Sequence, residues 1–300
     1  MYLVFDIGGT KMRLALSHDL HTFHSEPYIV DTPQAYADAL EYIGTFLSQK
    51  SEHISAAPLR VVAGGIAGTL AADKQSLIDT TNIGADWVGK PLAHDIAMIA
   101  GVNVVDVYLE NDCTMVGLGE LYHGSGSAYS KEDTTIAYVT VSTGVGSALF
   151  THGKPDDTVP FLINRVVLTD AQTACPQCTA VVGRDAIDIE SMISGTSVEA
   201  RVGKKPYEIP QDDPLWDTLS GYLAQGLKEL VSVWNPSVII LGGSMMVGDP
   251  KIYMKDLTAH FAQVCNEGGI PIAQLCLATL DSRGGLFGGL VYLEQKIQRV

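Results

Sequence analysis

A strand, a glycine turn and a second strand open the sequence, and the turn carries residues that can bind phosphate. Residues 2–6 are apolar and β-prone, which predicts a buried strand that ends at Asp6. The turn that follows reads Gly8-Gly9-Thr10-Lys11. Because glycine has no Cβ, the backbone N–H groups of this turn can converge on an anion, while the threonine adds a hydroxyl donor and the lysine a cation. Asp6 can hold a magnesium ion through water, although an ordinary hairpin would explain this stretch alone just as well.

The same arrangement returns in the middle of the chain. Residues 135–141 and 147–150 are predicted to be two strands, and the turn between them reads Ser142-Thr143-Gly144-Val145-Gly146. Thr143, Gly144 and Gly146 are therefore candidates for a second phosphate contact. Two such hairpins, with an acidic strand end between them, predict two similar domains. The first turn does not open a helix and matches neither GxGxxG nor GxxxxGK[ST], so it is not a Rossmann or Walker loop.

A third pair of glycines follows a predicted buried strand at residues 237–241. Gly242 and Gly243 would let an adenine or a ribose approach the backbone closely.

Asp112 is the candidate catalytic base. It follows a predicted strand at residues 104–109 and precedes a predicted helix at residues 113–120. A carboxylate at a strand end can accept a proton from a substrate at the mouth of a cleft. An aspartate in this position also caps a helix well, and the two roles are compatible.

Two loops offer further ligand contacts. Gly65 lies in a glycine-rich loop after the predicted strand at residues 60–63, where a ligand can meet backbone, although a plain turn is as good an explanation. Asn82 lies in a polar loop and offers both a donor and acceptors, which suits a sugar hydroxyl. A single loop asparagine is more often a turn former.

Amphipathic helices and further strands must hold these loops in place. Apolar residues recur at helical spacing along residues 34–50 and 217–234. Shorter helices are predicted at residues 91–100, 185–194 and 257–265, a strand at 274–279, and a last helix from Gly284. The sequence has no low-complexity linker, so the domain boundary is expected within compact structure near residues 112–116. The glycines of the last helix allow close helix packing or hinge motion, and this helix is expected to return to the first domain.

Composition excludes several classes of protein. With 46% apolar and 18% charged residues among 300, the chain can bury a large core and is not disordered. Its formal net charge of −15 disfavours a nucleic-acid backbone as partner. No apolar run is long enough to span a bilayer, and the chain enters a core strand at once, so neither a membrane partner nor a signal peptide is expected. Five scattered cysteines fit free thiols in a reducing cytoplasm.

Six motifs together resemble a known family. The first two turns look like the two phosphate motifs of the sugar kinase, actin and Hsp70 superfamily, and Leu241-Gly242-Gly243 looks like its adenosine motif. Within it, the chain is similar to the ROK family of bacterial sugar kinases and repressors. The sugar-binding loop of that family resembles Asn82 with Trp87, its catalytic segment resembles Glu110-Asn111-Asp112, and its second sugar-binding segment resembles the stretch that begins at Glu190. The order of the motifs matches over nearly the whole chain.

Two motifs of that family are missing here. Members usually carry GE-x-GH and the cluster CxCGxxGC, whose histidine and cysteines bind structural zinc. Where GE-x-GH is expected, the sequence reads Phe161-Leu162-Ile163-Asn164-Arg165-Val166-Val167. Cys175 and Cys178 have the spacing of half a zinc site, and no second half lies nearby. No structural zinc is therefore expected, and these motifs do not identify which sugar the protein binds.

The resemblance implies an α/β fold of two actin-like, ribonuclease H-like domains, each with a mixed sheet, and a cleft between them. Residues 1–115, completed by a helix at 287–300, would form the first domain and residues 116–286 the larger second one. The activity implied is ATP-dependent phosphorylation of a hexose or N-acetylhexosamine at its 6-hydroxyl, with Mg²⁺ near Asp6 and Asp112 as base. The sugar contacts implied are Gly65, Asn82, Asn111, Asp112 and Glu190.

Other functions stay open. A sugar-responsive repressor of the same family would carry an N-terminal helix-turn-helix, for which there is no room before Tyr2. A non-catalytic sugar- or nucleotide-binding protein would explain the missing GE-x-GH motif, but Asp112 and both phosphate turns are present. An actin-like or Hsp70-like ATPase would not explain Asn82 with Trp87. Glucose, fructose, N-acetylglucosamine, N-acetylmannosamine and allose all fit the same frame, and a cytoplasmic homodimer is the family expectation.

Overall fold

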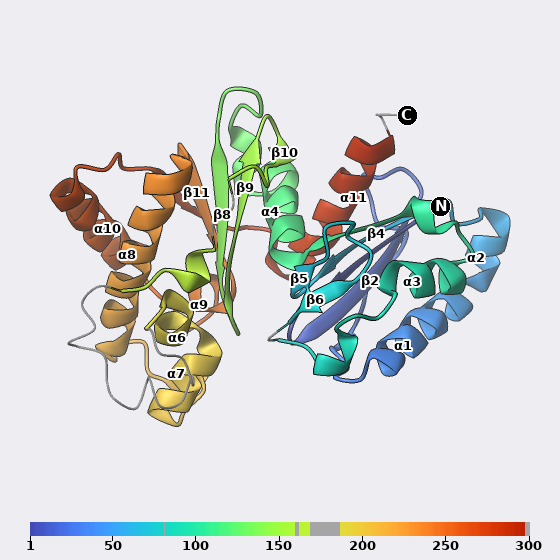
Figure 1. The fold of residues 1–300 in the computed structure, drawn as a ribbon, viewed down its shortest axis with the longest axis horizontal. Coiled ribbons are helices and arrows are strands. Elements are labelled where there is room, and N and C mark those ends of the chain that lie inside the picture. The colour runs from blue at the N-terminus through green and yellow to red at the C-terminus, as the bar shows by residue number, and fades with distance from the viewer. Residues whose placement is uncertain (81, 160–161, 169–186, 298–300) are drawn as a thin grey trace. The chain divides into compact units, whose positions relative to one another are not determined.

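The computed structural model describes residues 1–80, 82–159, 162–168 and 187–297. The chain divides into two compact units, which are drawn in Figure 1. The first unit is Met1–Gly124 together with the segment from Ser282 onwards, and the second is Ser125–Asp281. The domain boundaries predicted from the sequence, near residues 115 and 286, fall inside helices α4 (Asp112–His123) and α11 (Gly284–Ile297). Within the described residues, no helix is long and apolar enough to cross a membrane.

The sheet of the first unit has five strands in the order β3-β2-β1-β4-β7. Strands β2 and β3 run antiparallel to their neighbours, and β1, β4 and β7 run parallel to one another. The bounds are β1 (Tyr2–Ile7), β2 (Lys11–Ser17), β3 (Tyr28–Asp31), β4 (Val61–Ile66) and β7 (Val107–Asn111). A separate two-stranded ribbon is formed by β5 (Thr69–Leu70) and β6 (Leu77–Asp79).

Alternation along β1 assigns its side chains to two different layers. Leu3, Phe5 and Ile7 belong to a buried core with side chains of α1 (Tyr36–Gln49) and α3 (Leu92–Ala100). Val4 and Asp6 point to the other face, where they approach glycines of α11. Helix α4 packs beside α11 and contacts β4 and β7. The period of two therefore places Asp6 under the last helix. Helix α2 (Ser51–Ala56) and the short 3₁₀ helices η1 (Ala85–Trp87) and η2 (Val104–Asp106) complete the unit.

The second unit repeats the same topology. Its sheet has the order β10-β9-β8-β11-β12, with β8, β11 and β12 parallel and β9 and β10 antiparallel. The strands are β8 (Ile136–Val141), β9 (Val145–Thr151), β10 (Lys154–Pro155), β11 (Val238–Gly242) and β12 (Gln274–Leu277). The helices are α6 (Ile189–Ile193), α7 (Gly195–Val202), α8 (Leu215–Trp234), α9 (Ser244–Val247) and α10 (Met254–Gly268). The predicted stripe of α8 is confirmed at Leu219, Leu223 and Leu227, which are fully buried.

Three local predictions were wrong. Gly65, expected in a loop, lies within the strand β4, which continues to Ile66 and pairs with β1. Residues 104–106, expected to begin a strand, form the 3₁₀ helix η2, and the strand β7 starts at Val107. Val105 is 73% exposed, so the two valines of this stretch do not enter the core as those of a buried strand would. The residue that caps α4 is Asn111 and not Asp112, because the Asn111 Oδ1 accepts the N–H groups of Cys113 and Thr114 at 2.9 and 3.4 Å.

Candidate functional site

Three parallel strands of the first unit end side by side. Ile7 of β1 pairs with Ile66 of β4, and Ile66 pairs with Asn111 of β7. Because the strands are parallel, the residues that follow them emerge at one edge of the sheet. This edge brings together the glycine turn after β1, the loop after β4 and Asp112 at the start of α4.

Asp6 is buried at this edge and pairs with an arginine. Its side chain is 7% exposed, and Arg13 Nη1 lies 3.0 Å from its Oδ2. Burial raises the pKa of Asp6 to about 6, and this is the net value, because the positive charge of Arg13 opposes the rise. A Cβ on Gly285 of α11 would lie 2.6 Å from the Asp6 carboxyl carbon, so only glycine lets the last helix approach this carboxylate.

Asp112 is the first residue of α4, and its carboxyl group faces the first glycine turn. A Cβ added to Gly8 would lie 3.9 Å from Asp112 Oδ2. Burial first, and then the negative charge of Asp6, raises the pKa of Asp112 to about 7. A carboxyl group that titrates near neutral pH is well matched to take a proton from an alcohol.

The first glycine turn is braced from β3. Gly8 N–H donates to Lys11 O at 3.1 Å, which closes the turn, and Thr32 Oγ1 donates to Gly8 O at 2.6 Å. Lys11, the predicted phosphate cation, forms an exposed ion pair with Asp31 at 2.5 Å. An incoming phosphate would therefore compete with the Asp31 carboxylate for this ammonium group.

The predicted sugar loop packs directly on the phosphate turn. A Cβ on Gly9 would lie 2.8 Å from the Cβ of Asn82, so the two loops touch because Gly9 has no side chain. Trp87, which the family resemblance linked to this loop, is 1% exposed. Its Nε1 donates to Gln34 O at 3.2 Å and its ring packs edge-on against Tyr36. Trp87 thus belongs to the core of the first unit and anchors η1, which follows the Asn82 loop.

Gly65 and Asn111 shape the backbone around Asp112. A Cβ on Gly65 would lie 3.2 Å from Asp112 Cα, so glycine there lets α4 begin close to β4. Asn111 Nδ2 donates to Gly68 O at 3.0 Å, and its Oδ1 caps α4. Both polar atoms of the Asn111 side chain therefore already bond to backbone, and its predicted sugar contact stays a prediction.

In the second unit, the turn between β8 and β9 gathers several polar groups. Ser142 N–H donates to Gly144 O at 2.8 Å within the turn. Thr196 Oγ1 donates to Thr143 O at 3.0 Å. Glu190 Oε1 accepts the N–H of Val145 at 3.2 Å, so the predicted sugar ligand Glu190 lies at the second phosphate turn. Gly146 follows in β9.

The third glycine pair ends β11 at the same edge of its sheet. Gly243 has φ +86°, and a Cβ there would lie 2.3 Å from Val141 O. A Cβ on Gly242 would lie 2.3 Å from the Tyr138 hydroxyl oxygen. Ser244 Oγ lies 3.4 Å from Ser142 Oγ, which joins this turn to the second phosphate turn.

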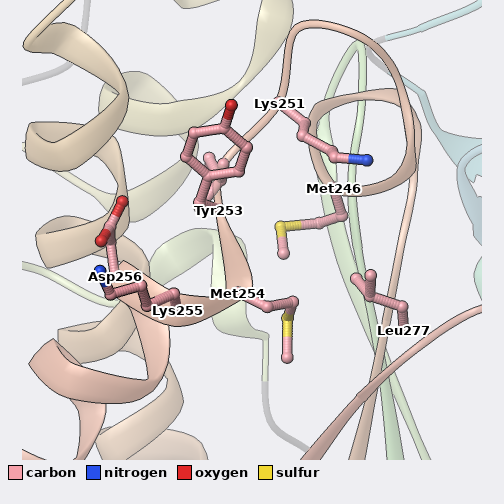
Figure 2. Close-up of a pocket in the computed structure, with 8 residues that line it drawn as sticks. Met246, Lys251, Tyr253, Met254, Lys255, Asp256 and Leu277 are labelled. Atoms are coloured by element: carbon pink, nitrogen blue, oxygen red, sulfur yellow. The ribbon is translucent and has the colours of Figure 1, made fainter. Parts of the chain in front are cut away.

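A mostly apolar pocket of about 600 Å³ adjoins this third turn. Its lining includes Met246, Tyr253, Met254 and Leu277. Figure 2 shows the two methionine side chains and Leu277 pointing into the same space. Met246 N–H donates to Gly243 O at 2.9 Å, and Leu277 pairs in register with Leu241, so the pocket is built on the same backbone as the glycine pair.

Comparison with known proteins shows which family this chain belongs to. A profile of the ROK family matches residues 2–296. The chain belongs to the ROK family. It is 26% identical over 203 residues to a fructokinase of Pediococcus pentosaceus, covering 65% of this chain and 66% of that protein. It is 24% identical over 312 residues to an N-acetylmannosamine kinase of Escherichia coli O6:H1, covering 97% of each.

A solved structure shows the fold of this ROK protein. A ROK family glucokinase from Streptomyces griseus, in complex with glucose and AMPPNP, matches with a TM-score of 0.68 and 21% identity over 98% of this chain and 99% of that chain. The predicted α/β fold with a mixed sheet in each domain is thereby confirmed, and each of these sheets has five strands.

Sequence reasoning missed two charged residues of this ROK protein that pair with buried carboxylates of the first unit. Arg13 was not singled out as a site residue, yet it pairs with Asp6. Lys74 was not singled out at all, and it forms an ion pair with the buried Glu110. The one available signal was Glu110 itself, a charge that interrupts an otherwise apolar strand and needs a partner.

Some residues on which the zinc prediction depends lie outside the described residues. These are Cys175, Cys178 and Phe161, the last from the segment that replaces GE-x-GH. Among the residues that the structure does describe, no group of three or more histidine, cysteine or acidic side chains is arranged to hold a metal ion.

Proposed function

We propose that this ROK protein is an ATP-dependent kinase that phosphorylates a hexose or N-acetylhexosamine, with Asp112 as its general base. The observation that carries the proposal is the position of Asp112, whose carboxyl group faces the Gly8 turn and has a pKa of about 7. The kinase names of its relatives and the bound glucose and AMPPNP of the Streptomyces griseus glucokinase support the same reaction class.

The reaction is an in-line phosphoryl transfer. Asp112 accepts the proton of the sugar hydroxyl, which the family resemblance assigns to the 6-position, while the hydroxyl oxygen forms a bond to the γ-phosphorus of ATP. The bond from that phosphorus to the β,γ-bridging oxygen breaks, and ADP leaves. We assign the phosphates to the turns at 8–11 and 142–146, the adenosine to Gly242 and Gly243, and the sugar to Gly65, Asn82, Asn111 and Glu190.

The Asp6 carboxylate fits a magnesium ion held through water. Its Oδ2 accepts a hydrogen bond from Arg13, and its Oδ1 lies on the side of Gly285, where a Cβ would come within 2.8 Å of it. A hard cation of this kind prefers carboxylate and phosphate oxygens and keeps several waters. When bound, it would neutralise charge on the transferred phosphate, while Arg13 fixes the orientation of the carboxylate.

A coupled ADP-release assay with Mg-ATP and a panel of sugars tests this function. Glucose, fructose, N-acetylglucosamine, N-acetylmannosamine and allose are compared, and turnover is expected with at least one of them. Mass spectrometry of the product locates the new phosphate and so tests transfer to the 6-hydroxyl. Nucleotide binding without turnover on any of these sugars would contradict the proposal and favour a non-catalytic binding protein. Size-exclusion chromatography of the same sample tests the proposed homodimer.

The pocket beside the third turn gives a separate prediction about ATP. Its apolar wall suits the flat face of a purine base, so Leu277→Arg, which places a charged side chain in the pocket, is expected to raise the KM for ATP. The rise should be about tenfold, since each tenfold in affinity corresponds to about 1.4 kcal/mol of lost contact. Steady-state kinetics at saturating sugar measures it.

The matched control for this substitution is Ile272→Arg. Ile272 is 53% exposed and does not line the pocket, so its replacement should leave the KM for ATP unchanged. An unchanged KM in Leu277→Arg as well would show that the base does not use this pocket.

A further inference from the structure

We infer that Lys74 is a positioning residue for the sugar site, acting through its ion pair with Glu110. This inference rests on the proposed function, because it concerns the sugar that the kinase would bind. The argument begins with Glu110, which lies two residues before Asp112 at the end of β7.

Glu110 is a buried carboxylate with partners from three parts of the first unit. Its side chain is 7% exposed and forms an ion pair with Lys74. Its Oε2 accepts a hydrogen bond from the Tyr292 hydroxyl of α11 at 3.2 Å, and its Oε1 accepts one from the Asn111 N–H at 3.0 Å. A buried carboxylate needs such partners, because water cannot solvate it there.

Lys74 lies in the turn of the β5–β6 ribbon. The turn is closed by hydrogen bonds from Lys74 N–H to Ala71 O at 2.8 Å and from Ala71 N–H to Ser76 O at 2.9 Å. Lys74 has φ +55°, a left-handed conformation that lysine seldom adopts. Its ammonium group nevertheless reaches the buried carboxylate at the end of β7.

The ribbon leads directly into the predicted sugar loop. Strand β6 ends at Asp79, three residues before Asn82. Asn111 Nδ2 fixes the other end of the ribbon through Gly68 O. Glu110 therefore holds the turn of the ribbon, and its neighbour Asn111 holds the end at Gly68. The next residue of the chain is Asp112, the proposed general base.

The ion pair is not needed to keep the ribbon folded. Gly89 N–H donates to Leu77 O at 2.8 Å, and Ala93 N–H donates to Gln75 O at 3.1 Å, so backbone bonds attach the ribbon to the segment before and within α3. Loss of the ion pair should therefore shift the ribbon without unfolding it. Because the sugar loop follows the ribbon, the expected effect is largest on sugar binding, with a smaller effect on ATP through the contact of Asn82 with Gly9.

Kinetics of Lys74→Met test this inference. The KM for the sugar is expected to rise by about tenfold, because small misplacements of a binding group are costly, while the KM for ATP rises clearly less. Lys74→Arg restores a positive charge and should recover most of the loss. Lys228→Met is the matched control, since it removes a partly buried ion pair with Glu229 in the second unit.

Hydrogen exchange gives a readout that does not depend on activity. Lys74→Met should speed amide exchange in residues 69–79, and Lys228→Met should not. Unchanged exchange in Lys74→Met would overturn the inference, as would equal rises in the KM for sugar and for ATP. If the wild-type protein phosphorylates no sugar, the proposed function fails, and the exchange data still decide whether Lys74 positions the ribbon.

Discussion

Replacing Asp112 with asparagine is expected to lower kcat by about 10²–10⁴-fold, the usual contribution of a general base. Asparagine keeps the size of the side chain and cannot take the proton of the sugar hydroxyl. The KM values for sugar and ATP should change little, because the phosphate turns and the Asn82 loop are untouched. ADP release with the best sugar of the panel measures the effect, and a variant that keeps wild-type kcat would exclude Asp112 as the base.

The pH profile should carry the signature of the same group. Burial, together with the charge of Asp6, raises the pKa of Asp112 to about 7, and the base acts only when ionised. The kcat/KM for sugar should therefore fall about tenfold per pH unit below pH 7. The residual activity of Asp112→Asn should lack this decline.

The contribution of Asp112 to folding stability should fall as the pH rises, whereas its contribution to activity should increase. A carboxyl group whose pKa rises on folding favours the folded state when protonated, so its contribution is full below its ordinary value of 3.8 and is lost as the pH rises through about 7. Asp112→Asn avoids the cost of a buried charge. It should therefore unfold at higher denaturant concentration than the wild type at pH 8, and this advantage should vanish near pH 4. Equal stability at pH 8 would contradict the burial argument.

Gly288→Ala is expected to destabilise the first unit strongly. A Cβ on Gly288 of α11 would lie 1.7 Å from Met115 O of α4, which is backbone and cannot rotate away. Overpacking of this kind typically costs about 1–3 kcal/mol, and a clash with backbone should fall at the upper end. Urea unfolding measures the loss, and activity should fall with it because α4 begins at Asp112.

Gly221→Ala is the matched control for this substitution. Gly221 lies in α8, and a Cβ there meets nothing within 4 Å. Alanine should stabilise this helix by about 0.5–1 kcal/mol, since glycine loses more backbone entropy on folding. A stabilising Gly288→Ala would show that α4 and α11 do not approach each other this closely.

Local pattern predicted the elements well because each carries its own periodicity. The strand before Asp6, the long helix that ends at Trp234 and the hairpin after residue 135 were all expected near their observed bounds. The family was also recognisable, because the order of several short motifs along the chain is specific even where each motif is common. The ROK family and the pair of mixed sheets are confirmed.

Contacts between distant segments were not predictable in the same way. Lys11 looked like a free cation, because its partner Asp31 comes from β3, whose antiparallel register with β2 no local signal fixes. Trp87 resembled part of a sugar loop, yet its ring is buried against Tyr36. Lys74 gave no signal, since its role depends on a left-handed turn that brings it to Glu110.

The contacts between α4 and α11 can form only after the ribosome has synthesised the second unit. Residues from Gly284 onwards supply the wall behind Asp6 and the helix that packs on α4, yet they follow the whole second unit along the chain. The ribosome therefore releases the strands and loops of the first unit long before the helix that completes them. The second unit, which is continuous in sequence, can fold while the first still waits for its last helix. During that interval the Val4 and Asp6 face of β1 is uncovered, and a chaperone has its clearest opportunity to bind there.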